Sequence, residues 1–161
     1  LHDMYMQGAT IAGTSAGAAA MSETMLISGG GNRSNDSESF SMAPGLGLLP
    51  GVVIDTHFAE RGRIGRLMGA VAQNPKNVGL GIDEDTALVV NGNNQFRVIG
   101  SGAVYVLDGS GITYSSLAEE HTRCIIATHD VKLHLLAKDN GFDLTNRQPL
   151  PPGITSTETK R

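Results

Sequence analysis

One serine of this sequence lies in a pattern that suits nucleophilic chemistry. Ser15 belongs to Gly13-x-Ser15-x-Gly17, which follows the short apolar run 9–12 and precedes the helix-prone run 18–21. Glycines on both sides allow the chain to turn from a strand into a helix so tightly that the serine Oγ is exposed. The pattern predicts a nucleophile elbow.

The helix expected after Ser15 would begin with a free backbone N–H at Ala16. This N–H would point to the place where an oxyanion forms, and the positive end of the helix dipole would favour the negative charge. A glycine-rich strand-to-helix turn with a serine N-cap explains the same residues without catalysis. The five residues alone leave both interpretations open.

A serine needs a base to attack an amide, and the sequence has five histidines. His57 is the best placed, because it ends the apolar run 52–54 and precedes a helical pattern. His2 lies at the chain end, and the others lie in a C-terminal β-rich region, at His121, His129 and His134. Taken alone, His57 could also be an ordinary helix-start histidine.

A third group must orient the imidazole, and Glu84 is the strongest candidate. Two apolar runs flank it, so its carboxylate needs a partner to stay charged. Asp83 and Asp85 compete for the role, and strand alternation would place them on the face opposite Glu84. A solvated turn also explains the acidic triplet. The order Ser15, His57, Glu84 differs from that of α/β-hydrolases and argues against an esterase or lipase.

The elements that must position these residues follow from the apolar pattern. Ile64, Leu67, Met68 and Val71 have the spacing of one helix face, and Asn74-Pro75 ends the helix. Strands are expected at 9–12, 52–54, 78–82, 86–90, 95–99 and 103–107, with an exposed edge strand at 131–136. Residues 28–51 are expected to be irregular and residues 149–161 a loose tail. We expect an α/β fold with a single hydrolytic domain over residues 1–148 and a β-rich C-terminal part.

Composition limits the function classes. The chain has 161 residues, 40% of them hydrophobic, and a formal net charge of −4, so nucleic acid is not an expected partner. No apolar run approaches the roughly 18 residues of a membrane span, and residues 1–10 lack the regions of a signal peptide. We expect a cytoplasmic protein without a membrane partner. The single Cys124 cannot form an internal disulfide.

Four blocks in fixed order resemble the cyanophycinases, of the serine peptidase family that also contains aspartyl dipeptidase. The resemblance spans roughly residues 9–107. The blocks are Gly13-Thr14-Ser15-Ala16-Gly17-Ala18, Pro44-Gly45-Leu46-Gly47-Leu48-Leu49, Asp55-Thr56-His57-Phe58-x-x-Arg61-Gly62-Arg63-x-Gly65-Arg66-Leu67, and Gly79-Leu80-Gly81-Ile82-Asp83-Glu84-Asp85-Thr86-Ala87.

The resemblance implies a Ser15, His57, Glu84 triad, no metal and no cofactor. It also implies a fold similar to the class I glutamine amidotransferases, with a largely parallel sheet between helices. Members of the family hold the first strands and a glycine-rich loop before the serine, so we expect that part of the fold to be missing here. A longer protein or a second chain would supply it, and a homodimer is the expected assembly.

Cyanophycin is a poly-aspartate chain with an arginine on each side-chain carboxyl. The resemblance implies an exopeptidase that hydrolyses it through an acyl-enzyme to β-aspartyl-arginine dipeptides. Asp55 and Glu60 would accept the substrate guanidinium, and Arg61, Arg63 and Arg66 would pair with carboxylates. For each arginine a solvated basic helix face is an equal alternative. An aspartyl dipeptidase-like peptidase and a non-catalytic relative are the other candidate functions.

Overall fold

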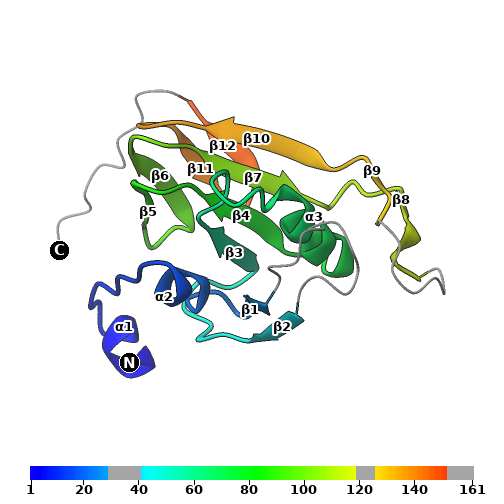
Figure 1. Ribbon diagram of the computed structural model, residues 1–161. Helices are drawn as coiled ribbons and strands as arrows, with labels where there is room; N and C mark the ends of the chain where they lie inside the picture. The colour runs from blue at the N-terminus through cyan, green and yellow to red at the C-terminus, as the bar shows by residue number, and fades with distance from the viewer. Residues whose placement is uncertain (29–40, 119–125, 152–161) are drawn as a thin grey trace.

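The computed structural model describes residues 1–28, 41–118 and 126–151. Within them lie two four-stranded sheets packed on each other, with a helix over the outer face of one (Figure 1). The expected α/β class is therefore confirmed in outline. Residues 29–40 of the expected irregular segment, Cys124 and residues 152–161 of the expected tail lie outside the described residues.

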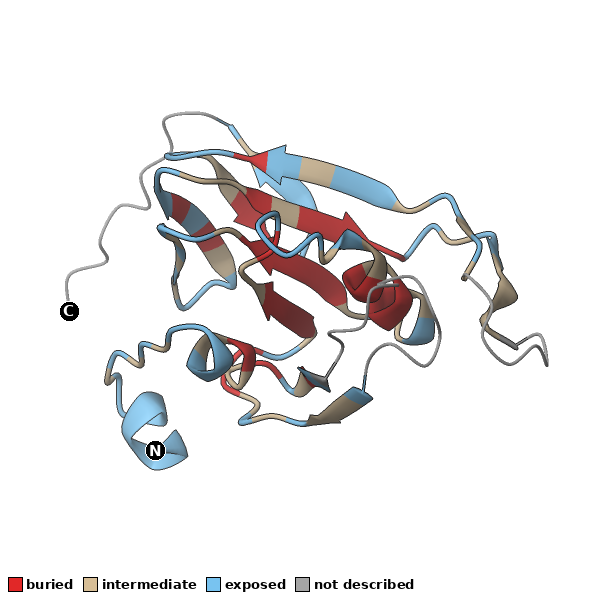
Figure 2. Ribbon diagram, in the orientation of Figure 1, coloured by how far each residue is buried: buried red, intermediate tan, exposed pale blue. Residues whose placement is uncertain are grey.

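The first sheet has the strand order β10-β7-β4-β3. Its strands are β3 (Val52–Thr56), β4 (Val78–Ile82), β7 (Val104–Asp108) and β10 (Lys132–Leu136). All five residues of β4 are buried, as are the first four of β3 (Figure 2). Among the described strands β10 pairs only with β7, and it is largely exposed, which confirms the expected edge strand.

The expectation of a largely parallel sheet is wrong for these strands. β3 and β4 are parallel, but β4–β7 and β7–β10 are antiparallel. A parallel pair needs a long crossover, and α3 (Ile64–Gln73) supplies one between β3 and β4. The chain from β4 to β7 instead runs through the β5–β6 hairpin, so β7 returns in the opposite direction.

The second sheet, in the order β12-β11-β6-β5, is antiparallel. It comprises β5 (Thr86–Val90), β6 (Gln95–Gly100), β11 (Gly141–Asp143) and β12 (Gln148–Leu150). Phe96 and Phe142 stack on its inner face and pack against the first sheet in one buried cluster. Pro149 and Leu150 pair with β11, so the ordered sheet extends two residues into the expected tail.

The other face of the first sheet is covered by α3 and Phe58, where Val53, Leu67 and Leu107 form a second buried cluster. Glycines on β4 allow this close packing. A Cβ on Gly79 would lie 2.7 Å from a Val71 methyl, and one on Gly81 would lie 2.6 Å from the Phe58 ring. The predicted helix is confirmed, and it packs directly on the strand that leads to the acidic triplet.

The N-terminal part differs most from expectation. Residues 9–14 form no strand, and the helices there are short, α1 at His2–Met6 and α2 at Ala16–Ala19. No residue of α1 is buried (Figure 2). Part of the expected irregular segment is ordered, because β1 (Thr24–Ser28) pairs antiparallel with β2 (Ser41–Pro44).

The remaining short elements precede β10 in the chain and lie beyond its beginning (Figure 1). They are β8 (Tyr114–Ser115), a 3₁₀ turn at Ser116–Ala118, and β9 (Thr128–His129), which pairs with β8. Across the described ranges, no helix is both long and apolar enough to cross a membrane.

Candidate functional site

The turn that carries Ser15 has the backbone strain expected of a nucleophile elbow. Ser15 has φ 50° and ψ −120°, a conformation that non-glycine residues rarely adopt, and its side chain is exposed before α2. A Cβ on Gly13 would lie 2.5 Å from the Gly17 carbonyl oxygen, so only glycine fits at position 13. The predicted elbow therefore forms, although no strand leads into it.

His57 lies at the end of β3, where the chain turns away before α3. Its φ is 51°, and the carbonyl before it, that of Thr56, accepts a hydrogen bond from Arg63 Nη1 at 2.5 Å. The next N–H, of Phe58, donates to the Ile82 carbonyl of β4 at 3.2 Å. These contacts fix the backbone on both sides of the imidazole.

The structure brings Ser15, His57 and Glu84 together in one hydrogen-bonded chain. Ser15 Oγ lies 2.9 Å from His57 Nε2, and His57 Nδ1 lies 2.8 Å from Glu84 Oε1. With the proton on Nδ1, this N–H donates a hydrogen bond to the Glu84 carboxylate, and Nε2 is left to receive the serine proton. Such an arrangement can activate a hydroxyl as a nucleophile.

The backbone N–H of Ala16 belongs to the first residue of α2, directly after Ser15. Among the described residues it has no hydrogen-bond acceptor, whereas the N–H groups of Gly17 and Ala18 donate to Thr14 and Ser15. A donor left without an acceptor next to a nucleophile is where an oxyanion would be stabilised.

The three acids of the triplet have different partners. Glu84 is the one that reaches His57. Asp85 accepts a hydrogen bond from Ser101 Oγ at 2.6 Å, and Asp83 accepts from backbone N–H groups. The triplet lies in the turn between β4 and β5 and not within a strand, so strand alternation does not decide which acid faces the histidine.

Burial revises the expectation that Asp55 and Arg66 contact substrate. Asp55 is 1% exposed and Arg66 is 7% exposed. Arg66 Nε donates to Asp55 Oδ2 at 2.6 Å, and its Nη2 donates to Asp55 Oδ1. A carboxylate already held by two charge-assisted bonds inside the protein is not free to receive a substrate guanidinium. This pair joins β3 to α3 and supports the fold.

Arg63 belongs to the same cluster. Its Nη1 lies 3.3 Å from Asp55 Oδ1 and also donates a hydrogen bond to the Thr56 carbonyl. Its side chain is 16% exposed. Burial, together with the neighbouring charge of Arg66, lowers the pKa of Arg63 from its ordinary value. Arg61 and Glu60, in contrast, are exposed in the turn that follows His57. Of the three arginines of this cluster, Arg61 is the exposed one.

Contacts of Glu60 and Asp83 were not predicted from the sequence. The Glu84 N–H donates to Glu60 Oε1, and the Ala59 N–H donates to Asp83 Oδ1. Each hydrogen bond joins residues 24 positions apart, so no local spacing in the sequence predicts it. The available signal was the presence of acids in both turns, directly beside the base and the expected acid.

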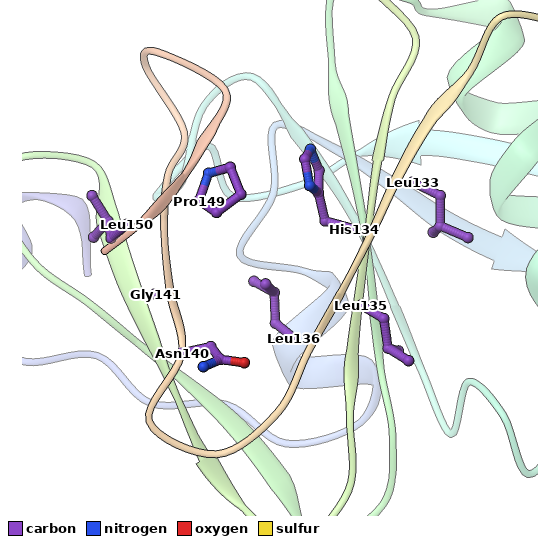
Figure 3. A pocket seen from close by; sticks show the side chains of 8 residues that line it. All are labelled: Leu133, His134, Leu135, Leu136, Asn140, Gly141, Pro149 and Leu150. Atoms are coloured by element: carbon purple, nitrogen blue, oxygen red, sulfur yellow. The ribbon is translucent and has the colours of Figure 1, made fainter. Parts of the chain in front are cut away.

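A separate pocket lies between β10 and the segment that forms β11 and β12 (Figure 3). His134 and Leu136 of β10 line one side, and Gly141 and Pro149 line the other. His134 Nε2 is buried without a hydrogen-bond partner among the described residues, and its ring packs 5.3 Å from that of Phe142. None of the Ser15, His57 or Glu84 side chains lines this pocket. Over the described ranges, no group of three or more His, Cys, Asp or Glu side chains is arranged to hold a metal ion.

Comparison with known proteins places these residues in context. The model of peptidase family S51 matches residues 1–98. A cyanophycinase from Trichormus variabilis is 39% identical over 142 residues, which cover 88% of this chain and 48% of that protein. The cyanophycinases of Geminocystis herdmanii and Synechococcus elongatus are 36% and 34% identical, covering 88% and 91% of this chain and 52% and 46% of their own length.

The chain therefore spans about half the length of the curated relatives it matches. A solved peptidase structure from an acI-B1 Actinobacterium aligns with a TM-score of 0.49 at 19% identity, covering 80% of this chain and 43% of that one.

Proposed function

The chain belongs to peptidase family S51, and we propose that it carries the catalytic residues of a serine-type peptidase. The observation that carries the proposal is the pair of hydrogen bonds that link Ser15 to His57 and His57 to Glu84. The positive φ at Ser15 and the Ala16 N–H, which donates to no acceptor within the described part of the chain, add support, because they expose the hydroxyl beside an oxyanion donor.

In the proposed reaction, Ser15 Oγ attacks the scissile carbonyl while its proton passes to His57 Nε2. Glu84 holds the imidazole in the required tautomer and stabilises the cation that forms. The Ala16 N–H stabilises the oxyanion of the tetrahedral intermediate. His57 then donates the proton to the leaving nitrogen, which departs as an amine and leaves an acyl-Ser15 ester. Water attacks the ester with His57 again as base, and Ser15 is regenerated.

We propose cyanophycin as the substrate and β-aspartyl-arginine as the product. Support comes from the curated relatives, which are cyanophycinases, and from the exposed Arg61 beside the base. A guanidinium at this position could pair with a carboxylate of an aspartyl-arginine unit. A homodimer, or a second chain that supplies the remaining part of the fold, is proposed for the complete protein.

The experiment is release of dipeptide from cyanophycin by the complete protein and its Ser15→Ala variant. Loss of release with an unchanged unfolding transition is expected, because an exposed serine contributes little packing. Release at the wild-type rate in the variant would refute Ser15 as the nucleophile. If the wild type cleaves β-aspartyl dipeptides but not the polymer, an aspartyl dipeptidase-like specificity replaces the proposed substrate.

A further inference from the structure

Two carboxylates outside the triad join the turn of His57 to the turn of Glu84. The Ala59 N–H, two residues after the base, donates to Asp83 Oδ1 at 2.9 Å. The Glu84 N–H donates to Glu60 Oε1 at 3.0 Å. The pattern is reciprocal, because each turn supplies one carboxylate and one backbone N–H to the other. Bonds between a charged acceptor and an N–H are about twice as strong as neutral ones.

Asp83 also ties both turns to the sheet. Its Oδ2 accepts the Ala103 N–H at 3.1 Å, and its own N–H donates to the Ala103 carbonyl at 3.2 Å. Ala103 directly precedes β7, so one half-buried carboxylate holds the end of β4, the start of β7 and the turn of His57. Glu60 is exposed, so its hydrogen bond from the Glu84 N–H is weaker than the one between the Ala59 N–H and Asp83.

We propose that Asp83 and Glu60 are positioning residues, which hold His57 and Glu84 at hydrogen-bonding distance by clasping their two turns. The inference rests on the proposed function. The need for such a clasp follows from the site itself, because the Glu84 side chain is 56% exposed and both partners lie on turns. Catalysis depends on this geometry so steeply that a shift of about 1 Å can lower the rate roughly 100-fold.

The aromatic pair beneath the clasp is consistent with this placement. Phe58, next to His57, packs on Tyr105 with ring centroids 4.9 Å apart. Burial raises the pKa of Tyr105, and the negative charges of Asp83 and Glu60 raise it further. The negative charges of both carboxylates therefore act on the same phenol.

The test measures kcat and KM on cyanophycin, and the rate at which a fluorophosphonate probe labels Ser15, in the complete protein. Asp83→Ala and Glu60→Ala are expected to lower both kcat and the labelling rate by roughly 10- to 100-fold, with the larger loss at Asp83 and little change in KM. Glu60→Gln keeps the one acceptor oxygen that Glu60 uses and is expected to recover most of its loss. Asp83→Asn keeps one of the two acceptor oxygens that Asp83 uses and is expected to recover only part. Asp85→Asn, in the same turn but bonded to Ser101, is the matched control and should keep the wild-type rate.

A double-mutant cycle separates positioning from general support of the fold. If the clasp acts through the triad, Glu60→Ala should cost several-fold less in a Glu84→Gln background than in the wild type. Equal costs in both backgrounds, or wild-type kcat in both alanine variants, would overturn the clasp while leaving the triad intact. A wild-type rate in Glu84→Gln alone would overturn the proposed function, and the clasp with it.

Discussion

Replacing Arg66 by Met should destabilise the protein by about 3–5 kcal/mol without any direct effect on catalysis. Met keeps much of the apolar stem but removes the guanidinium. Asp55, which is 1% exposed, then loses the hydrogen bonds from Arg66 Nε and Nη2. It keeps the hydrogen bonds from Arg63 Nη1 at 3.3 Å and from the Thr56 N–H at 2.9 Å. Removing one partner of a buried ion pair costs about 3–5 kcal/mol, because the other charge stays buried.

The assay is equilibrium urea unfolding of the complete protein, with ΔΔG of unfolding as the readout. A loss of this size is a large part of the roughly 5–15 kcal/mol that stabilises a typical domain. Arg61→Met is the matched control, since Arg61 is exposed, and its effect should stay within about 0.5 kcal/mol. A change below about 1 kcal/mol at Arg66 would refute its structural role.

Three further predictions concern the site and the fold. Glu84→Gln should lower kcat/KM by roughly 10²- to 10⁴-fold, by analogy with loss of the orienting acid in serine triads. A loss below about tenfold in steady-state kinetics would contradict this role for Glu84. Burial would raise the pKa of Asp108, but hydrogen bonds from the Ser110 N–H and Arg147 lower it, so its stabilisation is present above pH of about 4 and lost at lower pH. Unfolding of Asp108→Asn from pH 3 to 7 should therefore approach wild-type stability only at the acidic end, and a constant difference would contradict this. Gly81→Ala should destabilise by about 1–3 kcal/mol, because its Cβ would meet the Phe58 ring, and an unchanged urea midpoint would count against that packing.

Features with a local period were predictable from the sequence. The spacing of Ile64, Leu67 and Val71 predicted α3, and the alternation of residues 131–136 predicted the edge strand β10. Side-chain spacing in these elements follows directly from the backbone geometry, so a short window contains the signal. The glycine pattern around Ser15 predicted the tight turn for the same reason, because the backbone strain of that turn is set by adjacent residues.

Features set by distant partners were not predictable in this way. A strand at residues 9–12 was expected from apolar content, but a strand needs a hydrogen-bonded neighbour, and none of the described residues pairs with it. Asp55 and Arg66 were expected to contact substrate, yet these two residues, 11 positions apart on a strand and a helix, are buried against each other. The direction of β7 depended on an intervening hairpin that no single window reveals.

The central claim is that Ser15 is a nucleophile activated by His57. Its most direct measurement is to treat the complete protein with a fluorophosphonate probe and map the modified residue by peptide mass spectrometry, alongside the His57→Ala variant. Stoichiometric labelling at Ser15 is expected in the wild type, with a labelling rate at least about 100-fold lower in His57→Ala. Labelling at another serine, or an equal rate without the imidazole, would contradict it.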